Sequence, residues 1–364
     1  QMSKLAAKLG LDPVEIRLKN ILTRDKPLPV GTTIPGGVSL EQVIRATAQQ
    51  TNWIPRKELR REHGTTARAE LPRFVTGRGF VVGLKSFGFG FSFQENSWAA
   101  VELQGGAEID AAIVRIAGAD VGQGHHTAMA QIAAEILEID IEQIRLLVSD
   151  TAFTQSSGSA SASRLTFMAG KAVKEAAESA LKKWQDEERP AVAEAVSNAR
   201  ETTYFDENTG YCVPNFGYGY VAQMVEVTVD TETGFVTVDR VVCANDVGRA
   251  INPQQIIGQI EGAIVQAHGY AMLEDFRVDK GQVLTSNFST YLIPGVYDIP
   301  WQIDSIIVED PHPDGPYGAR GMGEMPFVPY AAAIASAVFD ATGVWFDEIP
   351  LTPERLLRGL RKIS

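Results

Sequence analysis

Cysteine is scarce in this sequence of 364 residues, which contains only Cys212 and Cys243. Two cysteines so far apart are too few for an iron–sulfur cluster or for a zinc site built from cysteine alone. Their scarcity also indicates a reducing compartment, because secreted proteins commonly carry disulfides. We therefore expect a cytoplasmic protein that has no cysteine-ligated metal of its own.

Basic residues are outnumbered, with 33 lysines and arginines against 45 aspartates and glutamates and a formal net charge of −12. This acidity argues against nucleic acid or an anionic membrane as a partner. No apolar run approaches the length of a membrane-spanning helix, about 20 residues, and the N-terminus has no charged-then-apolar signal pattern. With 45% hydrophobic residues, the chain has enough apolar material for a large core, and its length favours two lobes.

The N-terminal region has helical patterns. Residues 2–21 carry two apolar stripes separated by Asp12, which is followed by proline as at the start of a helix. Residues 40–52 predict another helix, whereas residues 56–72 are strongly charged and predict a solvated connection. Because the sequence starts at Gln1 inside a helical pattern, we expect a fragment or a processed piece of a longer protein.

Strands and helices intermix in the remainder of the chain. Alternation across a Thr-Gly turn predicts a β-hairpin over 219–246, and 186–217 reads as a polar surface excursion. Further strand-like runs lie at 98–103, 111–118 and 144–148. Helical patterns occupy the C-terminal parts of the segments 120–137, 154–184 and 246–275. Two more helical patterns occur at 331–343 and 356–360. The expected fold is therefore α+β, with mixed β-sheets, packed helices and two αβ lobes.

The stretch 315–329, GPYGARGMGEMPFVP, combines glycine and proline with a single acidic residue, Glu324. Glycine and proline permit tight backbone turns, so we predict a backbone-lined loop that leads into the helix at 331–343. A carboxylate shielded from water in such a loop is suited to act as a general base. The alternative is a glutamate in the first turn of that helix, where the helix dipole favours it.

A glycine-rich turn follows one of the predicted strands, where Gly122 and Gly124 bracket Gln123 before an amphipathic helix. Such a turn offers free backbone N–H groups and the positive end of a helix dipole, which makes it a candidate cradle for an anion or a phosphate. His125 and His126 are adjacent, so they point in different directions on a helix and cannot chelate one ion together. We interpret both histidines as structural.

Other segments have two interpretations. The serine-rich run that starts at Thr154 either approaches a ligand closely or is a flexible linker, and no G-x-S-x-G motif makes one of its serines a nucleophile. Phe87, Phe89, Phe91 and Phe93 alternate as on one face of a strand. They either pack in the core or leave room beside a flanking glycine for a flat ligand.

Six motifs occur in one order: DPVEIRLKN (12–20), VGQGHHT (121–127), SASASR…MAGKAV (159–173), DVGRAINP (246–253), GQIEG (258–262) and GARGMGE (318–324). The ordered set resembles the molybdenum-cofactor subunit of the xanthine dehydrogenase/aldehyde oxidase family of molybdenum hydroxylases. The resemblance covers nearly the whole chain and corresponds to the C-terminal part of that subunit. It implies that 1–72 is a helical and connecting segment and that 73–364 is a molybdopterin-binding domain of two αβ lobes.

The resemblance also implies site residues. Glu324 matches the carboxylate that acts as the base, and Phe89 matches the aromatic residue that packs on a flat substrate. Matches to the cofactor contacts are Gly122, Gln123, Gly124, Ala162, Ser163, Arg164, Leu165 and Gln259. The dithiolene of the pterin holds molybdenum in this family, so no side chain is expected as a metal ligand. One departure is Ala267-His268, where the family often has Gly-Leu.

The cofactor implied is molybdopterin with molybdenum, either plain or as the cytosine dinucleotide. Its substrate would be an aldehyde or a purine- or nicotinate-like N-heteroaromatic, hydroxylated with water as the oxygen source. Electrons would leave through two [2Fe–2S] clusters, usually to FAD. The expected partners are the N-terminal half of the molybdenum subunit, an Fe–S subunit and an FAD subunit, arranged as a dimer of heteromers. Two alternatives are a non-catalytic scaffold or assembly paralogue without molybdenum, and a phosphate-binding module for an unrelated nucleotide.

Overall fold

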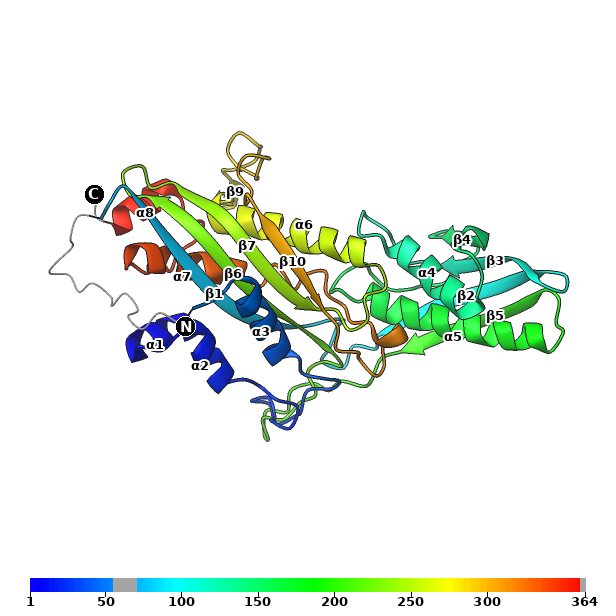
Figure 1. Ribbon diagram of the computed structural model, residues 1–364. Helices are drawn as coiled ribbons and strands as arrows, with labels where there is room; N and C mark the ends of the chain where they lie inside the picture. Colours follow the sequence, from blue (N-terminus) through cyan, green and yellow to red (C-terminus); the bar gives the residue numbers. More distant parts are fainter. Residues whose placement is uncertain (55–70, 361–364) are drawn as a thin grey trace.

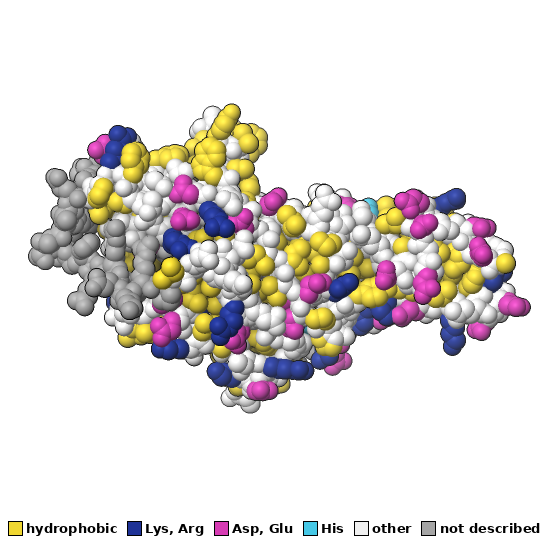
Figure 2. All heavy atoms as spheres, viewed as in Figure 1, with side chains coloured by type: hydrophobic (Ala, Val, Ile, Leu, Met, Phe, Trp, Pro, Cys, Tyr) yellow, Lys and Arg dark blue, Asp and Glu magenta, His cyan; other side chains and the backbone are white. Residues whose placement is uncertain are grey.

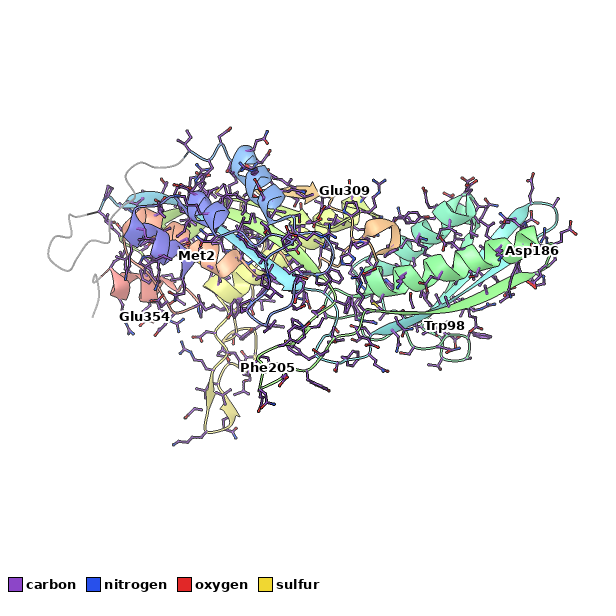
Figure 3. The ribbon with its side chains drawn as sticks, turned by 90° about the horizontal axis from the view of Figure 1, so that it is seen from below. Met2, Trp98, Asp186, Phe205, Glu309 and Glu354 are labelled. Carbon is purple, nitrogen blue, oxygen red and sulfur yellow. The ribbon has the colours of Figure 1, made fainter. Side chains whose placement is uncertain are left out.

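The computed structural model describes residues 1–54 and 71–360, which form an elongated molecule of two lobes (Figure 1). The charged connection predicted over 56–72 lies outside these residues, apart from Leu71 and Pro72. Seen from below, Met2 and Glu354 lie in the larger lobe and Trp98 and Asp186 in the smaller one (Figure 3). Each lobe contains a four-stranded mixed sheet with packed helices, so the predicted α+β class is confirmed.

The sheet of the larger lobe has the strand order β1-β6-β7-β10. Its strands are β1 (Phe74–Ser86), β6 (Tyr218–Asp230), β7 (Val236–Asp246) and β10 (Ile303–Val308). β6 and β7 form the predicted hairpin, and β1 is antiparallel to β6 along its whole length, whereas β10 is parallel to β7. β1 therefore forms one edge of this sheet.

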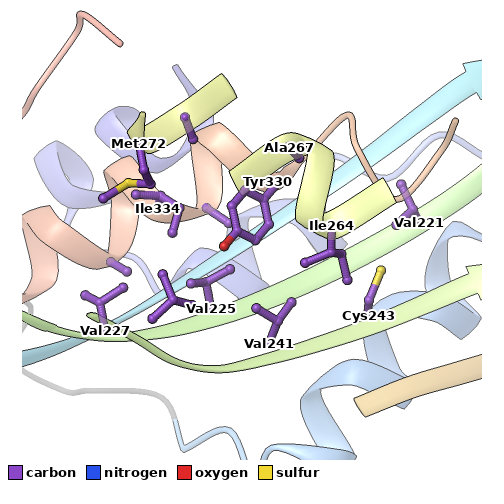
Figure 4. Close-up of a cluster of buried hydrophobic side chains, with 14 of the residues drawn as sticks. Val221, Val225, Val227, Val241, Cys243, Ile264, Ala267, Met272, Tyr330 and Ile334 are labelled. Carbon is purple, nitrogen blue, oxygen red and sulfur yellow. The ribbon is translucent and has the colours of Figure 1, made fainter. Parts of the chain in front are cut away.

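Two helices, α6 (Pro253–Met272) and α7 (Tyr330–Thr342), cover one face of this sheet. Their apolar side chains meet valines of β6 and β7 in a core that Figure 4 shows around Tyr330 and Ile264. α7 packs directly on the β1 backbone, since a Cβ on Gly77 or Gly79 would lie 2.1 Å from a carbonyl oxygen of α7. Glycine is required at both positions because only it permits this approach.

The N-terminal helices are α1 (Met2–Leu9), α2 (Pro13–Lys19) and α3 (Leu40–Gln50). The Asp12 carboxylate accepts hydrogen bonds from two N–H groups of α2, so the predicted helix start is confirmed. Val43 and Ile44 of α3 are buried in a second core with Phe80 and Tyr220 of the sheet. The C-terminal helix predicted at 356–360 is α8 (Pro353–Gly359).

The smaller lobe has the strand order β4-β3-β2-β5. Its strands are β2 (Asn96–Gly105), β3 (Ile109–Ile116), β4 (Ile144–Val148) and β5 (Ala191–Asn198). Helices α4 (His125–Leu137) and α5 (Leu165–Gln185) share an alanine-rich core with this sheet. Short elements complete the chain: the 3-10 helices η1 (Ile141–Gln143) and η2 (Pro316–Gly318), and the small hairpin of β8 (Val278–Asp279) and β9 (Gln282–Val283).

Two predictions were wrong in part. The polar segment 186–217 contains β5, which pairs with β2, and it also buries Cys212 and Phe216. The phenylalanine run does not form one strand face, because β1 ends at Ser86 and the chain then turns. Phe87 packs in the core against Phe167 at 4.8 Å between ring centroids, whereas Phe91 has a left-handed φ of 50°. The glycines between the phenylalanines permit the chain to turn here, which the alternating sequence pattern did not indicate.

A projection that carries β8 and β9 stands out from the larger lobe, and Figure 2 shows hydrophobic side chains gathered on it. Within residues 1–54 and 71–360, no helix combines the length and the apolarity needed to cross a membrane.

Candidate functional site

A cavity of 420 Å³ lies where the N-terminal ends of α4, α5 and α6 meet the loop that precedes α7. Most of the residues predicted from the sequence line it: Gln123, Gly124, Ser163, Arg164, Leu165, Gln259 and Glu324. Gly122 and Ala162 adjoin this lining without belonging to it, and Phe89 is not part of it. The structure thus brings four separate segments of the chain to one cavity.

The glycine-rich turn is held from within by Asp120. Gly122 and Gly124 adopt left-handed φ angles of 108° and 77°, which favour glycine. One Asp120 oxygen accepts the N–H groups of Gly122 at 2.9 Å and Gly124 at 3.2 Å, and the other accepts that of His126 at 3.1 Å. Burial would raise the Asp120 pKa, but these donors hold that pKa below its usual value. The expectation of free N–H groups at this turn is therefore wrong for these three.

The Gln123 side chain also closes its own loop. Its amide oxygen accepts the N–H of Val121 at 2.7 Å, and its amide nitrogen donates to the Ala119 carbonyl at 2.8 Å. His126 supports the same loop through a contact of 2.9 Å between its Nε2 and the Gly118 carbonyl. Gln123 therefore shapes the cavity wall while its side-chain hydrogen bonds stay within the loop.

The serine-rich segment closes against the loop of Glu324. Ala162 and Ser163 adopt consecutive left-handed φ angles of 52° and 53°, which are uncommon for residues with a side chain and typical of functional sites. The Ala162 carbonyl accepts the N–H of Gly88 at 2.7 Å, and a Cβ on Gly321 would lie 1.8 Å from the Ser163 carbonyl oxygen. These contacts argue against a flexible linker here.

Arg164 lines the cavity, yet its guanidinium group is bound within the protein. Its Nε lies 2.6 Å from a Glu95 carboxylate oxygen, and both side chains are 1% exposed. The other two nitrogens donate to the carbonyls of Ser157 at 2.6 Å, Ser159 at 3.2 Å and Asn96 at 2.6 Å. Arg164 therefore fixes the serine-rich segment to β2.

Glu324 lies on the cavity rim, six residues before α7 begins at Tyr330. The alternative of a glutamate in the first helical turn is therefore wrong. The Glu324 N–H donates to the Ser163 hydroxyl at 3.0 Å, and the Lys85 Nζ lies 2.7 Å from the carboxylate. The Glu324 side chain is 50% exposed. The prediction that its loop shields the carboxylate from water is therefore also wrong within the described part of the chain.

Buried polar residues anchor the loop of Glu324. Arg320 and Asp246, both with fully buried side chains, form an ion pair of 3.0 Å, and Arg320 also donates to the Tyr218 carbonyl at 2.8 Å. Burial raises the pKa of the Asp246 carboxyl, and Arg320 opposes that rise. The Gln223 amide donates to the Pro326 carbonyl at 2.7 Å. The loop is thus tied to β6 and β7 on both sides of Glu324.

Sequence reasoning missed several of these residues. Asp246 and Arg320 belong to the motifs at 246–253 and 318–324. Their opposite charges, close to glycines, could have indicated an ion pair between these two segments. Lys85 and Gln223 had no such signal, because a single polar residue within a strand pattern does not reveal which loop it contacts.

His125 and Gln259 are two of the polar side chains of the cavity wall that have no hydrogen-bond partner among the described residues. His125 is 2% exposed, and neither of its ring nitrogens has a hydrogen bond there. Burial lowers the pKa of His125 to about 4, so the ring is neutral at pH 7, with one donor and one acceptor nitrogen. Gln259, half-buried on α6, is the second. The Gln259 amide can serve a polar ligand in the cavity, whereas both His125 ring nitrogens are buried and Nε2 lies against Gly118.

Phe89 is 37% exposed, and its ring packs against Phe93 with 5.1 Å between centroids. Its N–H donates to Glu95 at 2.7 Å, so the backbone of this turn connects to the Arg164 ion pair.

In the described part of the chain, no cluster of three or more histidines, cysteines, aspartates or glutamates is placed to hold a metal ion.

A family described as the molybdopterin cofactor-binding domain matches residues 47–300. The chain is 31% identical to the aldehyde oxidoreductase of Megalodesulfovibrio gigas, an alignment that covers 99% of the chain and 40% of that protein. It is 30% identical to the 6-hydroxypseudooxynicotine dehydrogenase complex subunit gamma of Paenarthrobacter nicotinovorans, with 98% and 49% covered.

A solved structure of the aldehyde oxidoreductase from Desulfovibrio gigas superposes with a TM-score of 0.83 at 30% identity, covering 99% of the chain and 40% of that structure. The chain thus spans about half or less of the length of these relatives. The match to the domain family extends over more than half of the chain. The chain therefore belongs to the molybdopterin cofactor-binding domain family, the family of the molybdenum-binding subunits of xanthine dehydrogenases and aldehyde oxidoreductases.

Proposed function

We propose that this chain is the molybdopterin-binding part of a molybdenum hydroxylase and works together with partner polypeptides. The observation that carries the proposal is the convergence of the Gln123 turn, the Ser163 segment, Gln259 and Glu324 on one cavity of 420 Å³. Four independent segments with a matching family resemblance favour a catalytic subunit over an unrelated phosphate-binding module. Retention of Glu324 beside the cavity favours it over a scaffold without molybdenum.

The residues present fit a molybdopterin cofactor. A pterin has a planar edge of hydrogen-bond donors and acceptors, and the Gln259 amide offers a complementary donor and acceptor on the cavity wall. Hydroxyls of Ser161 and Ser163 line the same cavity and suit the oxygens of a phosphate. Gly122, Gln123, Gly124, Ala162 and Leu165 would shape the wall around the cofactor, and Arg164 would hold the serine segment in place.

The bound cofactor would supply the oxidative hydroxylation chemistry and accept the electrons. The role of this chain in the reaction is to place a base at the cavity rim. The Glu324 carboxylate would accept a proton at one of its oxygens, while Ser163 fixes its backbone and Lys85 holds its charge by an ion pair. Because the side chain is 50% exposed, exclusion of water from it would depend on partner polypeptide.

The substrate class proposed is an aldehyde or an N-heteroaromatic compound, with water as the oxygen source. Among the relatives, an aldehyde oxidoreductase and a subunit of a 6-hydroxypseudooxynicotine dehydrogenase complex support this range. Phe89 would pack on a flat substrate beside the cavity. Electrons would pass to Fe–S and FAD partners, and we propose a cytoplasmic dimer of heteromers that includes the other half of the molybdenum subunit. The division at residue 72 and the cytosine dinucleotide form belong to the same proposal.

The deciding experiment is metal and cofactor analysis of the native complex, purified through a tag on this chain. We expect about one molybdenum and one pterin per chain, with the pterin identified by mass spectrometry after release. A complex that contains the companion subunits but neither molybdenum nor pterin would overturn the proposal and favour the scaffold. A nucleotide without pterin would favour the phosphate-binding module.

A further inference from the structure

The edge strand β1 presents backbone groups that no other strand among the described residues pairs. Successive residues of a strand direct their N–H and C=O groups to opposite sides. Phe87, just beyond β1, donates its N–H to Gly217 and continues the ladder with β6, whereas the N–H of Arg78 donates to Asp340 of α7. The backbone N–H and C=O groups of the even-numbered residues of β1, among them Val82 and Leu84, therefore point away from β6.

The two halves of this edge differ. Near Arg78 the edge is covered, because the Asp340 carboxylate accepts the Arg78 N–H at 2.9 Å and Trp53 packs edge-on against Phe80 at 5.4 Å. The cavity beside this part of β1 measures 50 Å³. From Val81 to Leu84, by contrast, the strand borders a groove of 730 Å³. The unpaired half of the edge is thus the half that is open.

The walls of this groove are mostly apolar, although Gln1, Ser3, Lys4, Arg17, Asn20, Ser336 and Asp347 also line it. Ile21, Leu22, Leu40 and Ile44 line it from the N-terminal helices and the turn after α2. The opposite wall is α7, which contributes the small residues Ala331, Ala332 and Ala335. A row of backbone donors and acceptors between two mostly apolar walls matches an added β-strand, whose side chains alternate between the walls.

We propose that this groove receives a β-strand from the part of the molybdenum subunit that the relatives carry and this chain does not span. The inference rests on the proposed function. The relatives extend well beyond the match, which covers 40% to 49% of their length. Uncovered edge strands invite aggregation, so native assemblies pair or cover them. A second copy of this chain is a poorer occupant, because its net charge of −12 opposes self-association.

The position of the groove gives the added strand a role at the cavity. β1 runs from the groove to Lys85, which lies 2.7 Å from the Glu324 carboxylate. A strand paired with Val82 and Leu84 would therefore bring the other half of the subunit beside the exposed side of Glu324. Binding of the added strand to β1 would therefore also close the cavity beside Glu324.

The test is a photo-cross-link in the native complex. A benzophenone amino acid replaces Leu84, which is 38% exposed on the open half of β1. The matched control replaces Phe74, which is 60% exposed at the other end of the same strand. We expect Leu84 to cross-link to a peptide of the molybdenum subunit from outside residues 1–364, in at least roughly tenfold higher yield than Phe74. Hydrogen exchange gives a second readout, with the Val82 and Leu84 amides protected in the complex and unprotected in the isolated chain.

Other outcomes overturn the inference. A cross-link from Leu84 to a second copy of this chain, to an Fe–S or FAD subunit, or only within residues 1–364 would contradict it. So would unprotected Val82 and Leu84 amides in the complex. The proposed function fails separately, by the absence of molybdenum and pterin from the same preparation. A complex with the cofactor and without the cross-link would refute the docked strand alone.

Discussion

The Ser163 hydroxyl accepts the backbone N–H of Glu324 at 3.0 Å, which joins two loops that are 161 residues apart in the sequence. The same hydroxyl lies 3.4 Å from a Glu324 carboxylate oxygen. One small side chain thus determines where the serine segment and the acidic loop meet. The proposed base and the wall of the proposed cofactor site are consequently positioned by each other.

Glu324→Gln keeps the size of the side chain and removes its ability to accept a proton as a carboxylate. We expect full molybdenum and pterin content with turnover lowered at least about 100-fold, since general-base catalysis typically contributes a factor of this order or more. Metal analysis and steady-state kinetics of the purified complex measure both quantities. Glu261→Gln, at an exposed position of α6 outside the cavity lining, is the matched control. Near-normal turnover of the Glu324 variant would refute the role of this carboxylate.

Ser163→Ala removes the acceptor of the Glu324 N–H while the backbone stays the same. A hydrogen bond of this kind contributes about 1 kcal/mol, so we expect kcat to fall roughly fivefold and KM to change little. Kinetics at saturating and limiting substrate separate the two constants. Ser179→Ala is the control, because Ser179 is exposed on α5, outside the cavity lining, and its hydroxyl donates to the Glu175 carbonyl. An equal loss in both variants would show that the Ser163 contact does not position Glu324.

The sequence predicted those parts of the fold that follow from local pattern. The Asp12 cap, the β6–β7 hairpin and the helix after Glu324 each depend on residues adjacent in the chain. β5 escaped prediction because the residues it buries are small (Ala191, Ala193 and Ser197) and its two valines are exposed, so the usual apolar alternation of a strand is hidden until β2 pairs with it. The turn after Ser86 escaped for the opposite reason, since its phenylalanines imitate a strand.

The candidate site could be predicted as a set of segments but not as a set of contacts. Ordered motifs indicated that Gln123, Ser163, Gln259 and Glu324 belong together, and the cavity contains all four. The partners of these residues are distant in sequence and carry no local signature. Lys85 beside Glu324 and Asp120 within the glycine turn are examples. Their identification required the geometry.

The buried ion pair between Arg164 and Glu95 predicts a large loss of stability when one partner is removed. Arg164→Met leaves the Glu95 carboxylate, 1% exposed, without its cation, and such a loss costs roughly 3–5 kcal/mol in free energy of unfolding. Urea unfolding of the isolated chain measures this change. In the double variant with Glu95→Met, we expect recovery of more than half of the loss, because no charge then remains buried.

The control pair for this prediction is Lys174 and Glu178, which form an exposed i, i+4 ion pair on α5. Lys174→Met is expected to change the free energy of unfolding by no more than about 0.5 kcal/mol. If Arg164→Met had an equally small effect, the ion pair would not hold the serine segment.

Three buried histidines predict that the chain loses stability in mild acid. Burial is the largest cause that lowers the pKa of each of His125, His268 and His312 to about 4. Their ordinary value is 6.5, so between pH 6.5 and pH 4 the unfolded chain binds protons that the folded chain does not. Stability is therefore present above pH 6.5 and is lost as the pH falls toward 4, by up to about 1.4 kcal/mol per histidine for each pH unit.

His268→Leu isolates one of these contributions. The His268 Nδ1 lies 2.9 Å from the Tyr330 hydroxyl in the core between α6 and α7, so the substitution removes a hydrogen bond and costs a pH-independent offset of about 1 kcal/mol. The slope of unfolding free energy against pH between 6 and 4.5 should nevertheless become shallower by about 1.4 kcal/mol per pH unit, because one proton fewer is taken up on unfolding. Urea titrations at four pH values separate the offset from the slope. A slope that equals that of the unsubstituted chain would show that the folded protein already protonates His268 in this range, which is incompatible with a neutral ring buried beside Tyr330.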